Sequence, residues 1–233
     1  MWDSPFAGSA TCSAPTRRRP HGPADWTPTL LDRLTLDVPA GSYGLQVLFS
    51  DVANQQNWRM CAPTFLGWDI LDPAKSHRGV FFKAILENAC YQAFGEYANV
   101  GRITGRTDLP RQLVLSGGAG HSPVWCQILS DVLGKPVITP VEKEGTAIGA
   151  AIYAAVGAGL YHSTDEAVKA LVRQERVYEP DLGNHAVYLE EYARWRALYE
   201  NGLDLLERGL VKSMWQPPLT RSETQKVNPW KLR

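Results

Sequence analysis

A chain of 233 residues, of which 44% are hydrophobic, carries enough apolar material for one sizeable globular core. The 24 Lys and Arg residues balance the 24 Asp and Glu residues, so no basic field favours a nucleic-acid partner. The longest apolar stretch, 147–160, is interrupted by glycines and is too short to span a bilayer, and no apolar run precedes the basic residues 17–19. We therefore expect a cytoplasmic protein with no membrane partner.

The two ends of the chain differ in composition from its middle. Residues 1–28 contain five prolines among small and polar residues, which predicts a disordered or atypical tail. Residues 219–233 are polar and follow a proline pair, and we expect a loose C-terminal tail there. The globular domain is predicted to cover 29–218.

The first half of this domain should contain a strand and then a helix. Residues 43–49 have the β-branched and aromatic content of a strand, and residues 39–42 form a turn before it. A helix start is predicted at 72–75, and a helix at 80–94. Its apolar residues share one helical face, which we expect to be buried: Phe81, Ile85, Ala89 and Phe94.

The middle of the chain reads as strand, glycine turn and helix. Residues 112–116 form an apolar run that ends in Gly-Gly-Ala-Gly at 117–120, and the pattern predicts a helix over 123–133. Ser122 is the expected N-cap, Pro123 the first helical residue and Gly134 the left-handed stop. A further strand at 136–140 leads into a small-residue helix that begins at 144–151 and should pack closely against a neighbour. This alternation of strands and helices indicates an α/β domain.

Aromatic residues recur at helical spacing in the last third of the chain, at Tyr188, Tyr192, Trp195 and Tyr199. They predict a long amphipathic C-terminal helix, and we interpret the stripe as core packing. The four cysteines form no C-x-x-C pair, and the histidines lack ligand spacing, so we expect free thiols and no metal site built from protein ligands.

The glycine turn is the candidate binding feature. Backbone N–H groups that face outward at the positive end of a helix suit a phosphate or a carboxylate. The turn is neither a Walker loop nor a dinucleotide fingerprint, and a glycine turn that only reverses the chain is an equally good interpretation. His121 beside Ser122 could suggest acyl transfer, but no G-x-S-x-G elbow is present, which favours a capping serine.

Two segments, 113–137 and 144–151, resemble the C-terminal signature of the FGGY carbohydrate kinases, and the resemblance extends over about 30–218. Within that family, segments 39–44, 49–51 and 213–217 are similar to a branch that phosphorylates a small, linear, sugar-like signal. The resemblance implies an α/β, actin-like (ribonuclease H-like) ATPase C-terminal domain of a sugar kinase, with ATP and Mg²⁺ as cofactors. The implied nucleotide-binding residues are Gly117, Gly118 and Ser122.

The resemblance also implies what other residues do. Glu144, Thr146 and Gly149 match a helix start that packs beside the nucleotide, and Glu87 matches a family position without a catalytic role. The family's sugar-binding residues, phosphate loops and catalytic Asp belong before the matched segment and have no counterpart here. Asp51 and Asp131 are interpreted as surface carboxylates.

We therefore expect a kinase fragment that is inactive as an isolated chain, with no catalytic residue of its own. One alternative is a kinase that acts on another pentulose. A second alternative is a non-catalytic remnant that binds a nucleotide or a partner and self-associates through the surface that the missing domain would cover.

Overall fold

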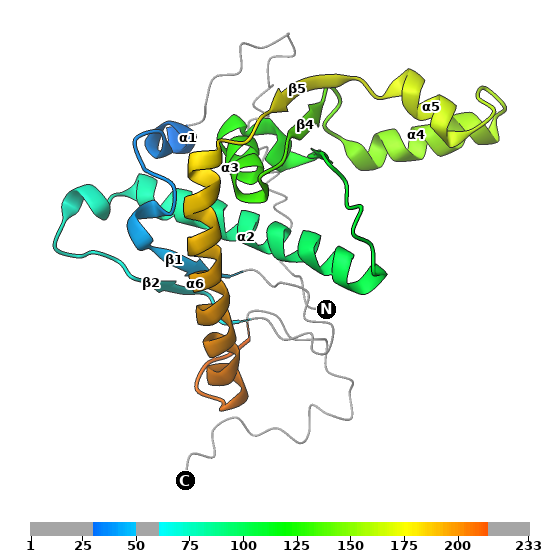
Figure 1. Cartoon of the computed structure of the whole chain (residues 1–233). Coiled ribbons are helices and arrows are strands. Elements are labelled where there is room, and N and C mark those ends of the chain that lie inside the picture. Colours follow the sequence, from blue (N-terminus) through cyan, green and yellow to red (C-terminus); the bar gives the residue numbers. More distant parts are fainter. Residues whose placement is uncertain (1–29, 50–60, 214–233) are drawn as a thin grey trace, which may run out of the picture.

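The computed structural model describes residues 30–49 and 61–213, and all structural statements below concern these residues (Figure 1). The predicted tails at 1–28 and 219–233, together with Cys12 and Asp51, lie outside them. The helices are α1 (Leu30–Thr35), α2 (Arg78–Thr104), α3 (Pro123–Leu133), α4 (Gly145–Gly157), α5 (Thr164–Leu171) and α6 (Leu182–Glu207). Three short 3-10 helices are η1 (Ser42–Gly44), η2 (Pro73–Lys75) and η3 (Gly118–His121). The strands are β1 (Gln46–Leu48), β2 (Thr64–Leu66), β3 (Leu113–Val114), β4 (Val137–Pro140) and β5 (Gln174–Tyr178).

The strands form two small sheets. β1 and β2 pair antiparallel, with Val47 opposite Phe65. The second sheet has the order β3-β4-β5, in which β3 runs parallel to β4 and β5 runs antiparallel to it. α4 and α5 form an arm that projects from the rest of the molecule next to β4 and β5 (Figure 1). The structure is thus of the predicted α/β class.

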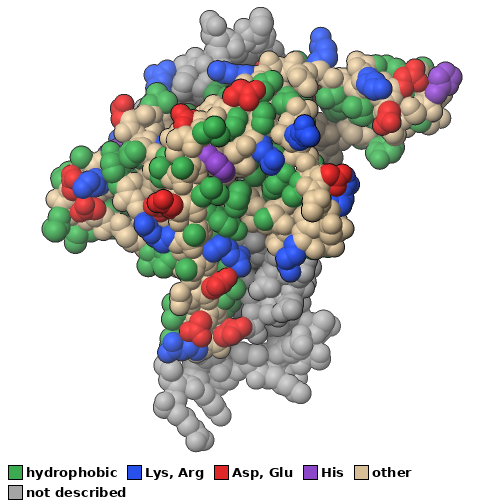
Figure 2. All heavy atoms as spheres, viewed as in Figure 1, with side chains coloured by type: hydrophobic (Ala, Val, Ile, Leu, Met, Phe, Trp, Pro, Cys, Tyr) green, Lys and Arg blue, Asp and Glu red, His purple; other side chains and the backbone are tan. Residues whose placement is uncertain are grey.

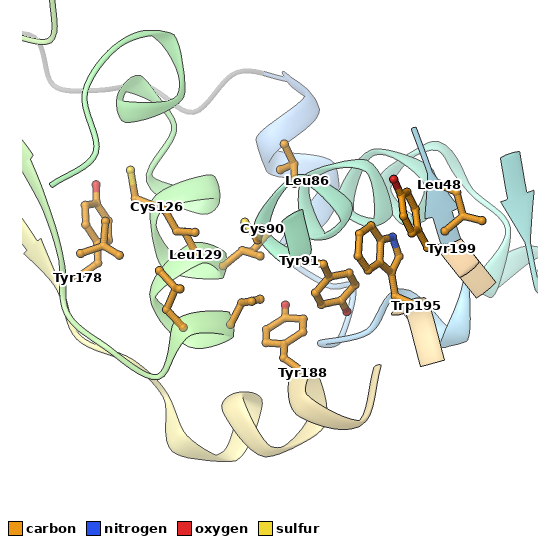
Figure 3. Close-up of a cluster of buried hydrophobic side chains, with 14 of the residues drawn as sticks. Leu48, Leu86, Cys90, Tyr91, Cys126, Leu129, Tyr178, Tyr188, Trp195 and Tyr199 are labelled. Atoms are coloured by element: carbon orange, nitrogen blue, oxygen red, sulfur yellow. The ribbon is translucent and has the colours of Figure 1, made fainter. Parts of the chain in front are cut away.

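The main core lies where α2, α3 and α6 meet. Trp195, Tyr188 and Tyr199 of α6 are fully buried, and the rings of Trp195 and Tyr199 stack at 5.4 Å (Figure 3). The Trp195 ring N–H donates to the Val47 carbonyl at 2.9 Å and to Asn88 Oδ1 at 3.0 Å, so a polar atom that burial would otherwise leave unpaired joins three elements. The predicted C-terminal helix and its packing role are confirmed.

The local signals around α3 are also confirmed. Ser122 Oγ accepts from the Trp125 N–H at 3.1 Å, Pro123 is the first helical residue, and Gly134 ends the helix at φ 61°. Cys61, Cys90 and Cys126 are buried free thiols, as predicted.

The strand predicted at 43–49 is confirmed in part: it is shorter than predicted, because a left-handed turn extends through its first two residues. Gly41, Ser42, Tyr43 and Gly44 all have positive φ values, between 47° and 85°, which no strand accommodates, so β1 begins at Gln46. The Glu87 carboxylate accepts from the Gly41 N–H at 3.0 Å and from the Ser42 hydroxyl at 2.7 Å. These buried bonds help to hold two non-glycine residues in a strained conformation.

The predicted buried face of the helix at 80–94 was wrong by about one position. α2 buries a different set of residues, which includes Val80, Ala84, Leu86, Glu87, Asn88 and Tyr91, whereas the predicted face is only partly buried. The true face contains two polar residues with hydrogen-bond partners inside the fold. Hydrophobic periodicity therefore pointed to the wrong stripe.

Asp131 is a second correction, because it is not a surface carboxylate. It is buried and accepts from Gln127 Nε2 at 2.7 Å, from the Asp181 N–H at 2.9 Å and from Asn184 Nδ2 at 2.9 Å. A buried carboxylate is tolerated when donors satisfy it. Asp131 therefore joins α3 to the start of α6.

Candidate functional site

The glycine turn lies at the carboxyl ends of two parallel strands. The Leu115 N–H donates to the Ile138 carbonyl at 2.8 Å, so β3 and β4 end side by side, and the chain continues from them into α3 and α4. In open α/β sheets, ligands bind outside the carboxyl ends of the strands. The fold therefore places the turn where a ligand site is expected.

Two glycines around the turn are required by the fold itself. Gly117 has φ 78° and ψ −165°, a conformation that is essentially restricted to glycine. At Gly145, the first residue of α4, a Cβ would lie 2.6 Å from Ser116 Oγ. These residues let the turn and the start of α4 approach each other, and they would be needed without any ligand.

Gly118 is different, because nothing among the described residues requires a glycine there. It is exposed, its φ is not positive, and a Cβ at this position would meet no atom within 4 Å. Gly149 in α4 also has open space in place of a Cβ, although alanine is favoured over glycine in a helix by about 1 kcal/mol. A residue without a side chain at each of these positions leaves room for something outside the chain.

The hydroxyl of Ser122 already has two protein partners. Besides capping α3, Ser122 Oγ donates to Asp32 Oδ1 at 2.8 Å and so connects the glycine turn to α1. One lone pair of the oxygen is left over after these two bonds. A contact between Ser122 and a nucleotide stays a prediction.

A pocket of about 220 Å³ opens beside the turn. It lies between the ends of β3 and β4 on one side and α4 on the other, and its lining is mainly apolar. The lining includes Ser116, Pro140, Gly145, Ile148, Gly149 and Ile152. An apolar slot next to a turn that exposes the backbone of Gly118 has the two kinds of surface that a nucleoside phosphate needs.

Lys143 holds the glycine turn and the start of α4 together, a role that sequence reasoning missed. Its side chain is buried and bonds the Pro140 carbonyl and the Glu175 carboxylate, while its own carbonyl accepts from the N–H groups of Gly117 at 2.6 Å and Gly145 at 2.9 Å. A lysine between two glutamates reads as exposed in a sequence, so no local signal would have identified it.

Glu87 and Asp131, two of the three buried carboxylates of the described region, each accept several hydrogen bonds. Besides its bonds to the turn at 41–42, Glu87 accepts from the Tyr188 hydroxyl at 3.0 Å. Burial raises the pKa of Glu87 from 4.5 to about 7, and the donated hydrogen bonds and the Lys83 charge offset only part of that rise. The hydrogen bonds of Glu87 and Asp131 thus stabilise the fold.

Metal-ligating and membrane-spanning features are absent from the described residues. Within residues 30–49 and 61–213, no three His, Cys, Asp or Glu side chains lie close enough together to hold a metal ion. No helix in this part of the chain is long and apolar enough to cross a membrane. His121, next to the capping serine, is exposed.

Comparison with known proteins defines the class of this α/β domain. The profile of the "FGGY family of carbohydrate kinases, C-terminal domain" matches residues 30–158. The chain therefore belongs to the FGGY family of carbohydrate kinases.

Among its relatives, the autoinducer-2 kinase of Yersinia enterocolitica is 39% identical over 192 residues, which cover 82% of this chain and 36% of the relative. The autoinducer-2 kinase of Escherichia coli K12 is 40% identical over 193 residues, with the same coverage. The chain thus spans about a third of the length of the curated relatives it matches.

Solved structures agree with this assignment. A xylulose kinase from Rhodospirillum rubrum is 31% identical, has a TM-score of 0.59, and matches over 73% of this chain and 33% of its own. A Plasmodium falciparum glycerol kinase with ADP, at 20% identity, a TM-score of 0.57 and coverage of 80% of this chain and 34% of its own, shares the fold. The actin-like C-terminal domain implied by the sequence is therefore confirmed.

Proposed function

We propose that this chain is the nucleotide-binding part of an ATP-dependent carbohydrate kinase, and that Gly117 and Gly118 meet the nucleotide through their backbone. The observation that carries the proposal is the open, exposed position of Gly118, for which the fold offers no internal reason. The family to which the chain belongs supports it. The domain that performs this role covers 29–218 in our proposal.

In this proposal each part of the site contacts a different part of the nucleotide. The backbone at 117–118 approaches the phosphates without a Cβ in the way, and the apolar pocket beside α4 accepts the base. The remaining lone pair of Ser122 Oγ accepts from the adenosine. Mg²⁺ arrives with the phosphates, which are its usual ligands in kinases, and neutralises charge during the transfer.

The acceptor is proposed to be a hydroxyl of a small sugar-like molecule. The autoinducer-2 kinases among the relatives favour the quorum-sensing signal autoinducer-2, 4,5-dihydroxypentane-2,3-dione, with its primary hydroxyl as the acceptor. The xylulose kinase from Rhodospirillum rubrum supports a second candidate, a xylulokinase-like reaction on a pentulose. Either reaction would take place in the cytoplasm.

A calorimetric titration with ATP and Mg²⁺ tests the nucleotide site. We expect weak binding by the unmodified chain and a loss of at least about tenfold in affinity for Gly118→Ala, because the added methyl occupies the approach to the backbone. Gly157→Ala is the matched control, since its Cβ also meets no atom within 4 Å and it lies at the far end of α4. Equal affinities for the two variants would contradict the proposal.

The same preparations separate binding from catalysis. Positioned acid–base groups contribute roughly 10²–10⁴ in rate, and none is assigned within this chain, so phosphorylated autoinducer-2 should stay at background for the chain alone. Product should appear when the part of an autoinducer-2 kinase that precedes its C-terminal domain is added. Robust turnover by the chain alone would require a base inside it and would overturn this division of roles.

A further inference from the structure

A second pocket among the described residues has no role in the proposed function. Its volume is about 340 Å³, compared with about 220 Å³ for the pocket beside α4, and the two pockets share no lining residue. α3 forms one wall, and the end of α1, α2, β5 and the start of α6 contribute the others (Figure 1). Small-molecule sites are usually concave places of this size. The pocket is therefore a candidate for a second ligand.

Two cationic side chains line this pocket, Lys83 of α2 and Arg176 of β5. The Lys83 amine donates to the Val38 carbonyl at 2.5 Å, and because an ammonium group has three donors, it has capacity for a further acceptor. The Arg176 guanidinium lies over the ring of Tyr178, 4.9 Å from its centroid, and these two residues share one side of β5 because they are two positions apart. Within the described part of the chain, neither cation belongs to an ion pair.

The surroundings of Lys83 favour an anionic ligand. Burial lowers the pKa of its amine, and the charges of Glu87 and Asp131 offset only part of this effect. Asp131 is the carboxylate that lines the pocket, and it already accepts three hydrogen bonds from within the fold. Two cations and one hydrogen-bonded carboxylate leave the wall of the pocket with a net positive charge.

Apolar and aromatic side chains make up most of the remaining lining: Leu36, Pro123, Val124, Ile128, Tyr178 and Tyr188. A molecule with an apolar body would cover these walls, whereas an inorganic ion would leave them uncovered. The 24 basic and 24 acidic residues of the chain balance, and Figure 2 shows the two kinds interspersed on the face that it presents, so a large polyanion has no broad basic field to bind. The pocket thus fits a small molecule that joins an apolar body to an anionic group.

We propose that this pocket binds a small organic anion, a carboxylate or a phosphate ester. Its anionic group lies between Lys83 and Arg176 and accepts charge-assisted hydrogen bonds from both. Its apolar body packs against Val124 and Ile128 of α3. The inference goes beyond the proposed function and does not rest on it, because the pocket shares no residue with the proposed nucleotide site.

Titrations followed by NMR test the ligand class on the unmodified chain. The probes are phenyl phosphate and benzoate, which carry both features, inorganic phosphate, which lacks the apolar body, and benzyl alcohol, which lacks the charge. Phenyl phosphate or benzoate should shift the side-chain amide signals of Gln127 and Asn184, which line the pocket, and the tighter of the two identifies the anionic group. Inorganic phosphate and benzyl alcohol should bind at least about tenfold more weakly.

A pair of arginine variants locates the bound probe. Arg176→Gln should weaken binding of the tighter probe by at least about tenfold, because the substitution removes charge-assisted hydrogen bonds. Arg173→Gln is the matched control, since Arg173 is exposed like Arg176 but lines the pocket beside α4. This control should bind the probe as tightly as the unmodified chain does.

Several outcomes would overturn the proposal. They are no binding of phenyl phosphate or benzoate at about 10 mM, equal binding of inorganic phosphate or benzyl alcohol, unshifted signals of Gln127 and Asn184, and an unchanged affinity of Arg176→Gln. A loss of affinity for Arg173→Gln would place the probe in the pocket beside α4, which also overturns the proposal but leaves the proposed function standing. Failure of ATP to bind would refute the proposed function alone.

Discussion

The Glu87→Gln substitution should change how the stability of this domain depends on pH. Glu87 is buried, and burial raises the pKa of its carboxyl from 4.5 to about 7 in the folded chain. Between these two values the folded state holds a proton that the unfolded state has released. The contribution of this group to stability is therefore fully present below pH 4.5 and is lost as the pH rises through 7.

The size of the effect follows from the shift in pKa. A difference of one pKa unit corresponds to about 1.4 kcal/mol, so the contribution of Glu87 should fall by roughly 2 to 3 kcal/mol between pH 5 and pH 8. Glutamine does not titrate and fits the same contacts, because its oxygen can face the Gly41 N–H and its amide can donate to the Ser42 hydroxyl oxygen. The variant should gain stability relative to the unmodified chain as the pH rises.

Urea denaturation followed by circular dichroism at several pH values between 5 and 8 measures this difference. The quantity of interest is the free energy of unfolding of the unmodified chain minus that of Glu87→Gln. Glu200→Gln is the control, because Glu200 is exposed and its curve should run parallel to that of the unmodified chain. A difference that stays constant within about 0.5 kcal/mol over this range would refute the argument, since it would mean that Glu87 has nearly the same pKa in both states.

Two further substitutions test the packing that positions the site. Gly134→Ala should lower stability by about 1 to 3 kcal/mol in a denaturation experiment, because φ is 61° there and the new Cβ would lie 2.7 Å from the His185 ring, and an unchanged midpoint would contradict this. Trp195→Phe should cost about 2 to 4 kcal/mol in the same assay, because the Val47 carbonyl and Asn88 would lose the ring N–H that binds both; a loss below about 1 kcal/mol would show that this donor matters little.

Local signals in the sequence predicted the elements that depend on local chemistry. Ser122, Pro123 and Gly134 set the limits of α3 because capping, a fixed φ and a left-handed stop each act within a few residues. The aromatic spacing of α6 was equally clear, since those residues reach the core from one helix face.

Features that depend on contacts between residues far apart in the chain could not be predicted from local sequence signals. The left-handed turn at 41–44 is held by Glu87, about 45 residues away, and the buried Asp131 is satisfied by donors some 50 residues later. β5 has four exposed residues of five and became a strand by pairing with β4. At the candidate site, the sequence shows a cluster of glycines. Only the fold distinguishes Gly118 from Gly117 and Gly145, which the backbone conformation or a close contact requires to be glycine.

The carbonyl oxygen of Lys143 has a mechanical consequence. It accepts from both Gly117 and Gly145, so its two lone pairs bind the glycine turn and the first residue of α4 at once. Neither segment can shift by much without breaking its bond to this oxygen. If the proposed nucleotide displaces the turn, the first residue of α4 would move with it. The helix would then tilt, and the far end of the arm that α4 forms with α5 would be displaced.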